Sequence, residues 1–350
     1  MPYTNINKSS DHFNTLLWTG NSGTQSVTGN NFTADFTWHK TRSNAESHVL
    51  MDTVRDAGTQ LNQSISSNTS NAEGILNNSS YITVNSTGFN TYNTSGGTLN
   101  YNTYTYATWL WKAGGHTGSS NSDGTITSTV SANTTSGFSI VKYTGNLTSG
   151  ATIGHGLGAK PAMIIIKNLA ASESWLCYHT SLGATKHIKL NATEAAGTAT
   201  SRFNDTEPTT SVFTVGNDPQ TNGNSNDMIA YCFAEKIGFS KFGSYVGANS
   251  NQFIYLGFKP AMVIIKNTSI TENWSIYDNK RLGYNPAHNR LYPNLNNAEA
   301  TETKIDFVSN GMMLRSAGDG HLTGGTNTFV YMAFAAAPLV GSNNVPCTAR

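Results

Sequence analysis

The stretch LGAKPAMIIIKN, from Leu157 to Asn168, decides the fold because the chain carries it more than once. It returns as GFKPAMVIIKN at residues 257–267, and a more divergent copy, NFTADFTWHK, occupies residues 31–40. The run PAMIIIKN is short, almost continuously apolar and closed by Lys-Asn, which is typical of a strand buried on both faces and followed by a turn. Three copies of such a strand predict a β-fold with an internal repeat.

Four further landmarks accompany each copy, in the same order along the chain. They are WTGN, YTGN and YVGA (18–21, 143–146 and 245–248); HVLMD, WLCYH and WSIYD (48–52, 175–179 and 274–278); NAE, ATEA and NAEA (71–73, 192–195 and 297–300); and YATWLWKA, MIAYCFAE and FVYMAFAA (106–113, 228–235 and 329–336). The period is roughly 100 residues, the size of a small domain, whereas solenoid repeats run to about 20–50 residues.

The repeat divides the chain into three modules, at residues 1–115, 116–238 and 239–350. Short strands separated by Gly, Asn and Ser turns favour antiparallel sandwiches of jelly-roll type. The second module opens with an insertion in which GTITSTVS, residues 124–131, alternates with period two and predicts an added strand. We therefore expect an all-β protein of three repeated antiparallel β-sandwich modules. Its termini, the first fifteen residues and 338–350, are expected to be extended.

One segment gives a conflicting signal. Leu50, Met51 and Val54 lie three or four residues apart, a spacing that predicts a short helix over residues 46–56. This helix competes with the strand expected at HVLMD.

Composition excludes several classes of protein. Charged residues make up 12% of the 350 residues and the net charge is +1, so no basic field for nucleic acid is present. The longest apolar runs, such as Phe329–Ala337, are too short to span a bilayer, and the N-terminus does not resemble a secretory signal. The three cysteines have no metal-ligand spacing, so we expect neither a metal site nor a cofactor.

Residues that bear chemistry have a structural and a functional interpretation. His155, in the turn GHGLG, is a candidate ligand or base, although a turn histidine bonded to backbone is the commoner arrangement. Paired carboxylates at Glu73, Glu194 and Glu299 would suit a glycosidase. A residue present in every copy is more typical of a shared turn, so these glutamates and Lys40, Lys167 and Lys266 are predicted to be structural, and no catalytic residue is assigned.

The tryptophans are candidates for stacking on sugars, as in lectin-like sandwiches. Most of the six lie in apolar runs and are expected to pack in the core. Trp38, Trp175 and Trp274 are retained as candidate contacts with a ligand or a neighbouring chain.

Several long motifs resemble a family of structural proteins of tailed phages, especially phages of marine cyanobacteria. The matching stretches are WTGNSGTQSVTG (18–29), GTITSTVSANTTSGFSIVKYTG (124–145), IGHGLGAKPAMIIIKN (153–168), AYCFAEKIGFSKFGSYVG (230–247) and VPCTAR (345–350). The resemblance covers essentially the whole chain. It implies a protein of the virion, in most members a tail fibre or another appendage, without a cofactor and without catalytic residues to carry over.

This resemblance leads to three hypotheses. The first is a non-enzymatic tail-fibre or receptor-binding component, and the second is a decoration protein on the capsid. The third is a glycan-degrading tailspike. We expect a position on the particle surface, assembly in the host cytoplasm, other virion proteins as partners, a homo-oligomer with a trimer as one arrangement, and a glycan or protein of the host surface as the receptor. No partner among nucleic acids and no membrane insertion are expected.

Overall fold

A computed structural model describes residues 4–76, 80–92, 98–286, 289–302, 304–315 and 318–340. Strands dominate this part of the chain, and all the strand pairs in its sheets are antiparallel. Its helices are one 3-10 turn, η1 (Ser9–Asp11), and two four-residue helices, α1 (Thr200–Phe203) and α2 (Pro219–Asn222). The expected all-β sandwich class is confirmed.

Unit 1, as we call residues 13–111, is a sandwich of two four-stranded sheets. Its main sheet has the order β1 (Phe13–Thr19), β10 (Thr105–Trp111), β3 (Phe36–Thr41) and β4 (Val49–Asp52). Its outer sheet has the order β2 (Gln25–Thr28), β9 (Gly88–Tyr92), β8 (Tyr81–Asn85) and β5 (Gln60–Leu61), beside a small pair β6 (Gln63–Ser64) and β7 (Gly74–Ile75).

Unit 2, residues 119–233, has a wider main sheet of eight strands. The order is β11 (Ser119–Asn121), β12 (Ser128–Asn133), β13 (Phe138–Thr144), β20 (Asp227–Phe233), β15 (Met163–Asn168), β16 (Leu176–His179), β17 (Lys186–Lys189) and β18 (Gly197–Thr198). The outer sheet is the pair β14 (Ala151–Gly154) and β19 (Val212–Val215). The strand predicted in the insertion is present as β12, which pairs with β13.

Unit 3, residues 240–338, again has a main sheet of four strands. The order is β21 (Ser240–Val246), β29 (Thr328–Pro338), β23 (Phe258–Asn267) and β24 (Ser275–Asp278). The outer sheet is β22 (Gln252–Tyr255), β28 (Gly311–Leu314) and β27 (Ile305–Val308), and β25 (Asn289–Arg290) pairs with β26 (Ala300–Thr301).

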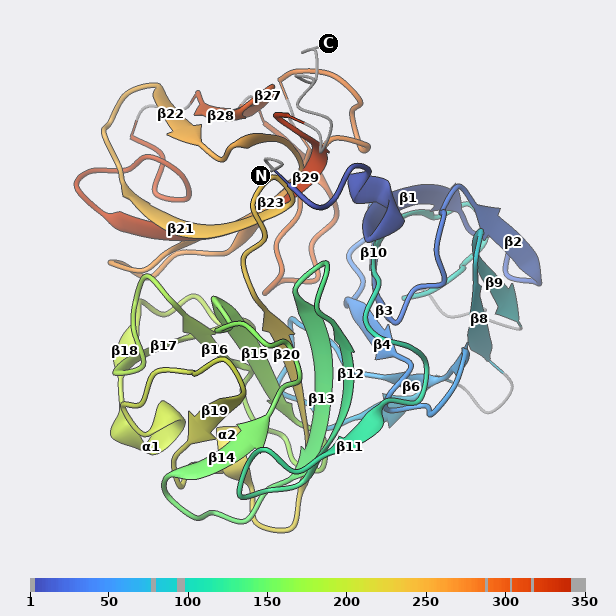
Figure 1. Ribbon diagram of the computed structural model, residues 1–350. Coiled ribbons are helices and arrows are strands. Elements are labelled where there is room, and N and C mark those ends of the chain that lie inside the picture. The colour runs from blue at the N-terminus through green and yellow to red at the C-terminus, as the bar shows by residue number, and fades with distance from the viewer. Residues whose placement is uncertain are drawn as a thin grey trace.

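The three main sheets share one strand order. In each, the strand bearing the WTGN-type landmark pairs with the closing aromatic strand, which pairs with the PAMIIIKN-type strand and then with the fourth strand: β1-β10-β3-β4, β13-β20-β15-β16 and β21-β29-β23-β24. Figure 1 shows the units grouped around a common centre, with unit 3 at the upper left, unit 1 at the right and unit 2 below.

Each main sheet lies between two hydrophobic cores. One face of every main sheet contributes to a single shared core at the centre of the molecule, and the other face packs inside its own unit. In β15, Met163 and Ile165 face the shared core, and Ile164 and Ile166 face the core of unit 2. Alternate side chains of a strand point to opposite faces, so a strand between two cores must be apolar throughout.

The helix predicted over residues 46–56 is wrong. Residues 49–52 form β4, in which Leu50 faces the shared core and Val49 and Met51 face the core of unit 1. Burial on both sides of a strand satisfies all three apolar side chains, whereas a helix would bury one face only. Tertiary packing therefore overrides the local spacing.

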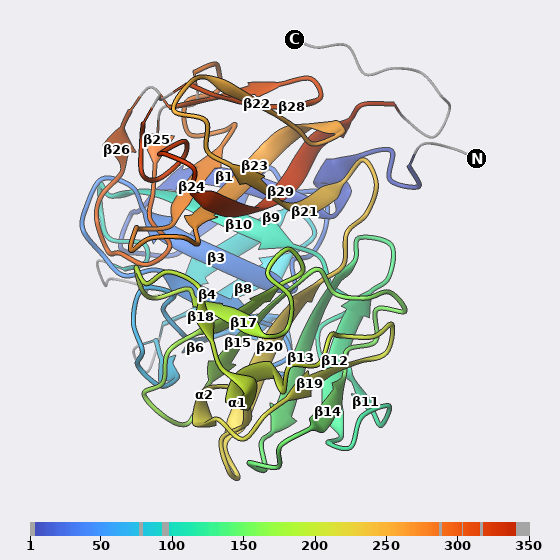
Figure 2. The same ribbon diagram turned by 90° about the vertical axis from the view of Figure 1, so that its left-hand side faces the viewer.

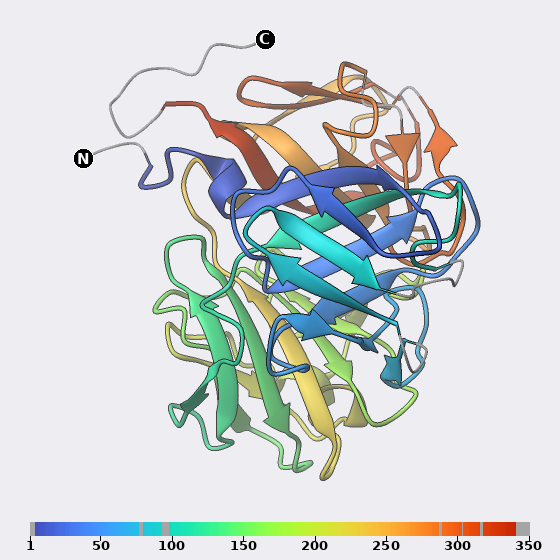
Figure 3. The ribbon, with the colours of Figure 1, turned by 90° about the vertical axis from the view of Figure 1, so that its right-hand side faces the viewer.

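The expected extended termini are only partly observed. Phe13 already begins β1, and before it Ile6 is buried in the shared core, so the described N-terminal segment is packed against the protein. Figures 2 and 3 show this segment and the end of β29 on the same side of the molecule. Pro338 ends β29, and the tail expected beyond residue 340 lies outside the described residues.

Candidate functional site: polar contacts between the units

The first set of contacts involves the residue directly before the fourth strand of each main sheet. Each unit there donates a ring N–H to a backbone carbonyl of another unit. The bonds are His48 Nε2 to Tyr292 O (2.9 Å), Trp175 Nε1 to Ser66 O (3.0 Å) and Trp274 Nε1 to Lys189 O (2.9 Å). Unit 1 thus binds unit 3, unit 2 binds unit 1, and unit 3 binds unit 2, which closes a cycle.

These bonds decide how the candidate tryptophans are used. Trp38, Trp175 and Trp274 are all at most 2% exposed, and they belong to the shared core. An aromatic ring that stacks on a sugar must present a face to solvent. All three rings therefore pack in the shared core without an exposed face for a ligand, and Trp175 and Trp274 also hydrogen-bond a neighbouring unit.

His48 stands where units 2 and 3 have Trp175 and Trp274, and one tautomer of its ring lets it donate the equivalent hydrogen bond. Trp38 Nε1 donates to His48 Nδ1 at 2.8 Å, so the imidazole proton is on Nε2 and is donated to Tyr292 O. Complete burial lowers the pKa of His48 to about 3, and the ring is neutral near pH 7. Units 2 and 3 carry Ile165 and Ile264 where unit 1 has Trp38, so in unit 1 the indole lies on the neighbouring strand and a histidine takes the tryptophan position.

The second set joins each closing strand to the end of a fourth strand in another unit. Trp109 Nε1 donates to Asp278 Oδ2 at 3.1 Å, and Tyr231 donates its hydroxyl to Asp52 Oδ2 at 2.8 Å. The matching position in unit 3 is Met332, which has no proton to donate. At this third contact, between units 2 and 3, His179 stands in place of the aspartate. Its Nε2 donates a hydrogen bond to Tyr331 O at 3.1 Å.

The two aspartates extend into buried ion-pair chains. Asp52 pairs with Arg55, whose Nη1 lies 2.8 Å from Glu73 Oε1. In unit 3, Arg281 Nε lies 2.6 Å from Asp278 Oδ2 and its Nη1 lies 3.2 Å from Glu299 Oε2. Both arginine side chains are fully buried. Such pairs are costly to break because the remaining charge is left in a medium of low dielectric constant.

Arg55 keeps its charge because of its partners. Burial alone would lower the pKa of Arg55, but Asp52, Tyr231 and Glu73 together hold it well above its ordinary value. Each arginine also donates from Nη2 to the carbonyl five residues earlier, at Leu50 or Ile276. The D-x-x-R pattern at residues 52–55 and 278–281 was the signal in the sequence that could have revealed these chains.

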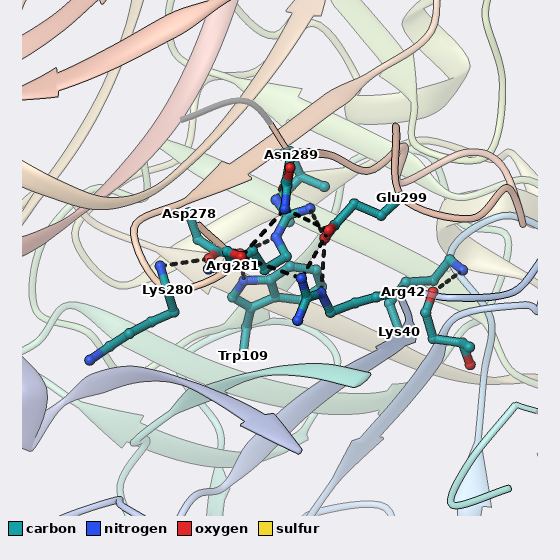
Figure 4. A network of polar contacts seen from close by, with 10 residues as sticks. Lys40, Arg42, Trp109, Asp278, Lys280, Arg281, Asn289 and Glu299 are labelled. Carbon is teal, nitrogen blue, oxygen red and sulfur yellow. Dashed lines mark hydrogen bonds and ion pairs between the residues drawn. The ribbon is translucent and has the colours of Figure 1, made fainter. Parts of the chain in front are cut away.

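Glu299 is the junction between units 1 and 3 (Figure 4). Arg42, from the end of β3, approaches its carboxylate through Nε at 3.0 Å and Nη2 at 2.9 Å. Arg281 and Asn289 reach the same carboxylate from within unit 3. The backbone N–H of Glu299 donates to Arg42 O at 2.8 Å, so the two units are joined by backbone and side chain together.

The expected equivalence of Glu194 with Glu73 and Glu299 is wrong. Backbone bonds from Glu73 N to Leu169 O and from Glu299 N to Arg42 O are matched in unit 2 by Ala196 N to Thr268 O. Glu194 instead pairs with Lys189, and 60% of its side chain is exposed. Two residues separate Glu194 from β18, whereas Glu73 and Glu299 directly precede β7 and β26.

Unit 2 therefore meets unit 3 through a histidine and two apolar side chains where the other units use charged groups. His179, Leu182 and Ala196 stand at the positions of aspartate, arginine and glutamate. Leu182 and Ala196 pack against the shared core. Arginine side chains bind Glu73 and Glu299, whereas Glu194 pairs with Lys189. These glutamates therefore do not supply the paired carboxylates of a glycosidase.

The repeated lysines bind carbonyl groups. Lys167 Nζ donates to Asn168 O and Ala171 O and, across the interface, to Ser70 O of unit 1. Lys266 Nζ donates to Asn267 O and Glu272 O and, across the interface, to Thr193 O of unit 2. Lys40 Nζ donates to Thr41 O and Asn44 O. Burial lowers the pKa of Lys40 to about 7 and those of Lys167 and Lys266 to about 8. Lys167 and Lys266 thus tie the turns after their strands to the neighbouring unit, and Lys40 binds the turn of its own unit.

His155 is a buried turn residue. Its Nδ1 accepts a hydrogen bond from Leu157 N at 3.2 Å, and its Nε2 lies 3.3 Å from Thr209 O. The side chain is inaccessible to solvent, and burial lowers its pKa. This geometry stabilises the GHGLG turn and leaves no open position for a ligand.

Residues 8–338 match a family model described as a domain of unknown function, DUF7483. No curated protein matches the chain. Within the described residues, no group of three or more His, Cys, Asp or Glu side chains is arranged to hold a metal ion. No helix in the described ranges is long and apolar enough to cross a membrane.

Proposed function

We propose that this chain, which belongs to the DUF7483 family, is a non-enzymatic structural component of a tailed-phage particle that acts at the particle surface as a tail-fibre or receptor-binding part. The assignment to a phage rests on the motif resemblance. The observation that carries a structural role is the use of buried charge. The carboxylates that Arg55 and Arg281 hold also receive hydrogen bonds from neighbouring units: Asp52 from Tyr231, Asp278 from Trp109 and Glu299 from Arg42.

A receptor-binding role needs a rigid body that presents recognition groups outward. The cyclic contacts fix the three units, so that the loops at their periphery keep a defined arrangement. The outer sheet of unit 3 exposes Phe253 and Tyr255 on one side of β22, at 42% and 50%. Aromatic residues at an exposed surface with Asn-, Ser- and Thr-rich loops are typical of contacts with glycans or proteins.

A second candidate is a decoration protein on the head. The grouping of three units of one strand order around a common centre favours it, because such a chain matches a site of local threefold symmetry with a single copy. The two candidates share the same scaffold and differ in the surface that the protein binds.

Labelling of intact particles tests both candidates. An antibody against this chain, visualised by immunogold electron microscopy, is expected to mark the tail or its tip. Label over the head would reject the fibre hypothesis in favour of decoration. Particles that carry no label although the chain is produced during infection would reject a virion role altogether.

A further inference from the structure

A polar pocket lies where the linker after unit 1 meets the edge of unit 2. Its volume is about 360 Å³, and residues 114–121, 130–132 and 156 line it. The volume falls in the range of about 300–1,000 Å³ typical of small-molecule sites, which favour boundaries between domains. None of the candidates from the sequence lies in its lining, although Gly156 follows His155 directly.

Glycines give the pocket its shape. Gly156 has φ +68°, and a Cβ at this position would lie 3.0 Å from Val130 Cγ1. Gly118 also has φ +68°, and its Cβ would lie 3.0 Å from Thr129 Cγ2. Side chains at these two positions would be strained and would crowd β12, so the backbone itself forms part of the wall.

His116 is held at the pocket by a buried carboxylate. Its Nδ1 lies 3.0 Å from Asp35 Oδ1, and the Asp35 side chain is 2% exposed. Asp35 also accepts from Ala113 N at 2.7 Å and from the Thr53 hydroxyl at 3.3 Å. His116 lines the pocket, and 37% of its side chain is exposed.

The lining selects the chemistry of the ligand. It offers hydroxyl, amide and backbone groups from Thr117, Ser119, Ser120 and Asn121, with Val130 and Ala132 as an apolar floor. His116 is the only ionisable side chain among the described residues of the lining. No lysine or arginine is present there to bind a phosphate or carboxylate.

We infer that this pocket binds one neutral pyranose unit of a glycan, with His116 as a positioned hydrogen-bonding residue. A sugar ring combines hydroxyl groups for the polar wall with C–H groups for the apolar floor. The inference rests on the proposed receptor-binding role for the source of the glycan. The pocket itself stands on the geometry alone.

The test is a titration of the isotopically labelled full chain with four methyl pyranosides: glucoside, galactoside, mannoside and N-acetylglucosaminide. At least one is expected to shift the backbone amides of Gly115 and Gly118 saturably, with Kd of the order of 1 mM. Inorganic phosphate, titrated in the same way, is expected to leave these amides unshifted.

Two variants make the test specific. Thr117→Trp, at the exposed rim, is expected to weaken the sugar's binding at least about tenfold. Ser86→Trp, on the distant turn between β8 and β9, serves as the matched control and is expected to bind normally. Absence of shifts with all four sugars at about 50 mM, binding that survives Thr117→Trp unchanged, or binding of phosphate alone would overturn the inference. Each of these results leaves the immunogold test of the virion role unaffected.

Discussion

Ile165 and Ile264 are the clearest test of the buried strands at the scale of single residues. They occupy matching positions in β15 and β23, are at most 4% exposed, and face the shared core. Either change to alanine should lower the free energy of unfolding by about 2–5 kcal/mol, since it removes three methyl(ene) groups and leaves a cavity. Chemical denaturation measures the loss, and two nearly neutral variants would show that these residues are not in a packed core.

Arg55 allows the ion-pair chain to be compared with the apolar version that unit 2 already contains. Arg55→Leu leaves Asp52 buried without its cation and should cost about 3–5 kcal/mol. Adding Asp52→His and Glu73→Ala, which copies His179, Leu182 and Ala196, should recover most of this loss.

The control for this comparison is Lys142→Leu, because Lys142 pairs with Asp227 at an exposed position. It should change stability by less than about 1 kcal/mol. A triple variant no more stable than Arg55→Leu would mean that the two interfaces are not interchangeable.

The sequence revealed single residues only where burial leaves a pattern. The PAMIIIKN strands were predictable because burial on both faces produces a continuous apolar run. The landmark HVLMD places His48 opposite Trp175 and Trp274, but the letters do not reveal that all three rings donate an N–H to matching backbone carbonyls. Glu194 was misplaced because two extra residues before β18 shift the landmark without changing its letters.

At the scale of elements, the closing strands β10, β20 and β29 should be the most stable parts of the molecule. Each pairs on both edges and has almost every residue buried. Hydrogen exchange requires these amides to open, so their protection should approach the global free energy of unfolding. The edge strands β2 and β22 should exchange much faster. Similar rates in both groups, read by mass spectrometry, would contradict the layered arrangement.

The helix predicted over residues 46–56 shows why local spacing failed at this scale. Three apolar residues at spacings of three and four suit a helix in a protein with one core. Here β4 lies between two cores, so Leu50 and Met51 are buried on opposite faces of a strand, and Val54 is buried in the turn that follows. The existence of a shared core could not be read from any one segment.

At the scale of the whole molecule, buried histidines should make the protein sensitive to acid. Burial lowers the pKa of His39 and His48 to about 3 and that of His179 to about 4. The unfolded chain therefore binds more protons than the folded protein between pH 6.5 and these values, and stability is lost as the pH falls through this range. At pH 5 each histidine should cost about 2 kcal/mol.

Two carboxyl groups oppose this trend. Burial raises the pKa of Asp35, and it raises that of Asp56 to about 6, which favours the folded state as the pH falls. Two carboxyl groups offset less than the three histidines lose. The free energy of unfolding from urea titrations should therefore drop between pH 7 and pH 5. His39→Gln should reduce this drop by the contribution of one histidine. A free energy of unfolding that does not change with pH would argue against neutral buried imidazoles.

The common strand order of the three main sheets is what an internal repeat would produce, and the cyclic contacts join the units into one body around a shared core. If this central claim is correct, no unit should unfold alone, because each would expose its face of the shared core. Differential scanning calorimetry of the full chain tests it most directly. We predict one transition with equal calorimetric and van't Hoff enthalpies. Two or three separate transitions would contradict the account.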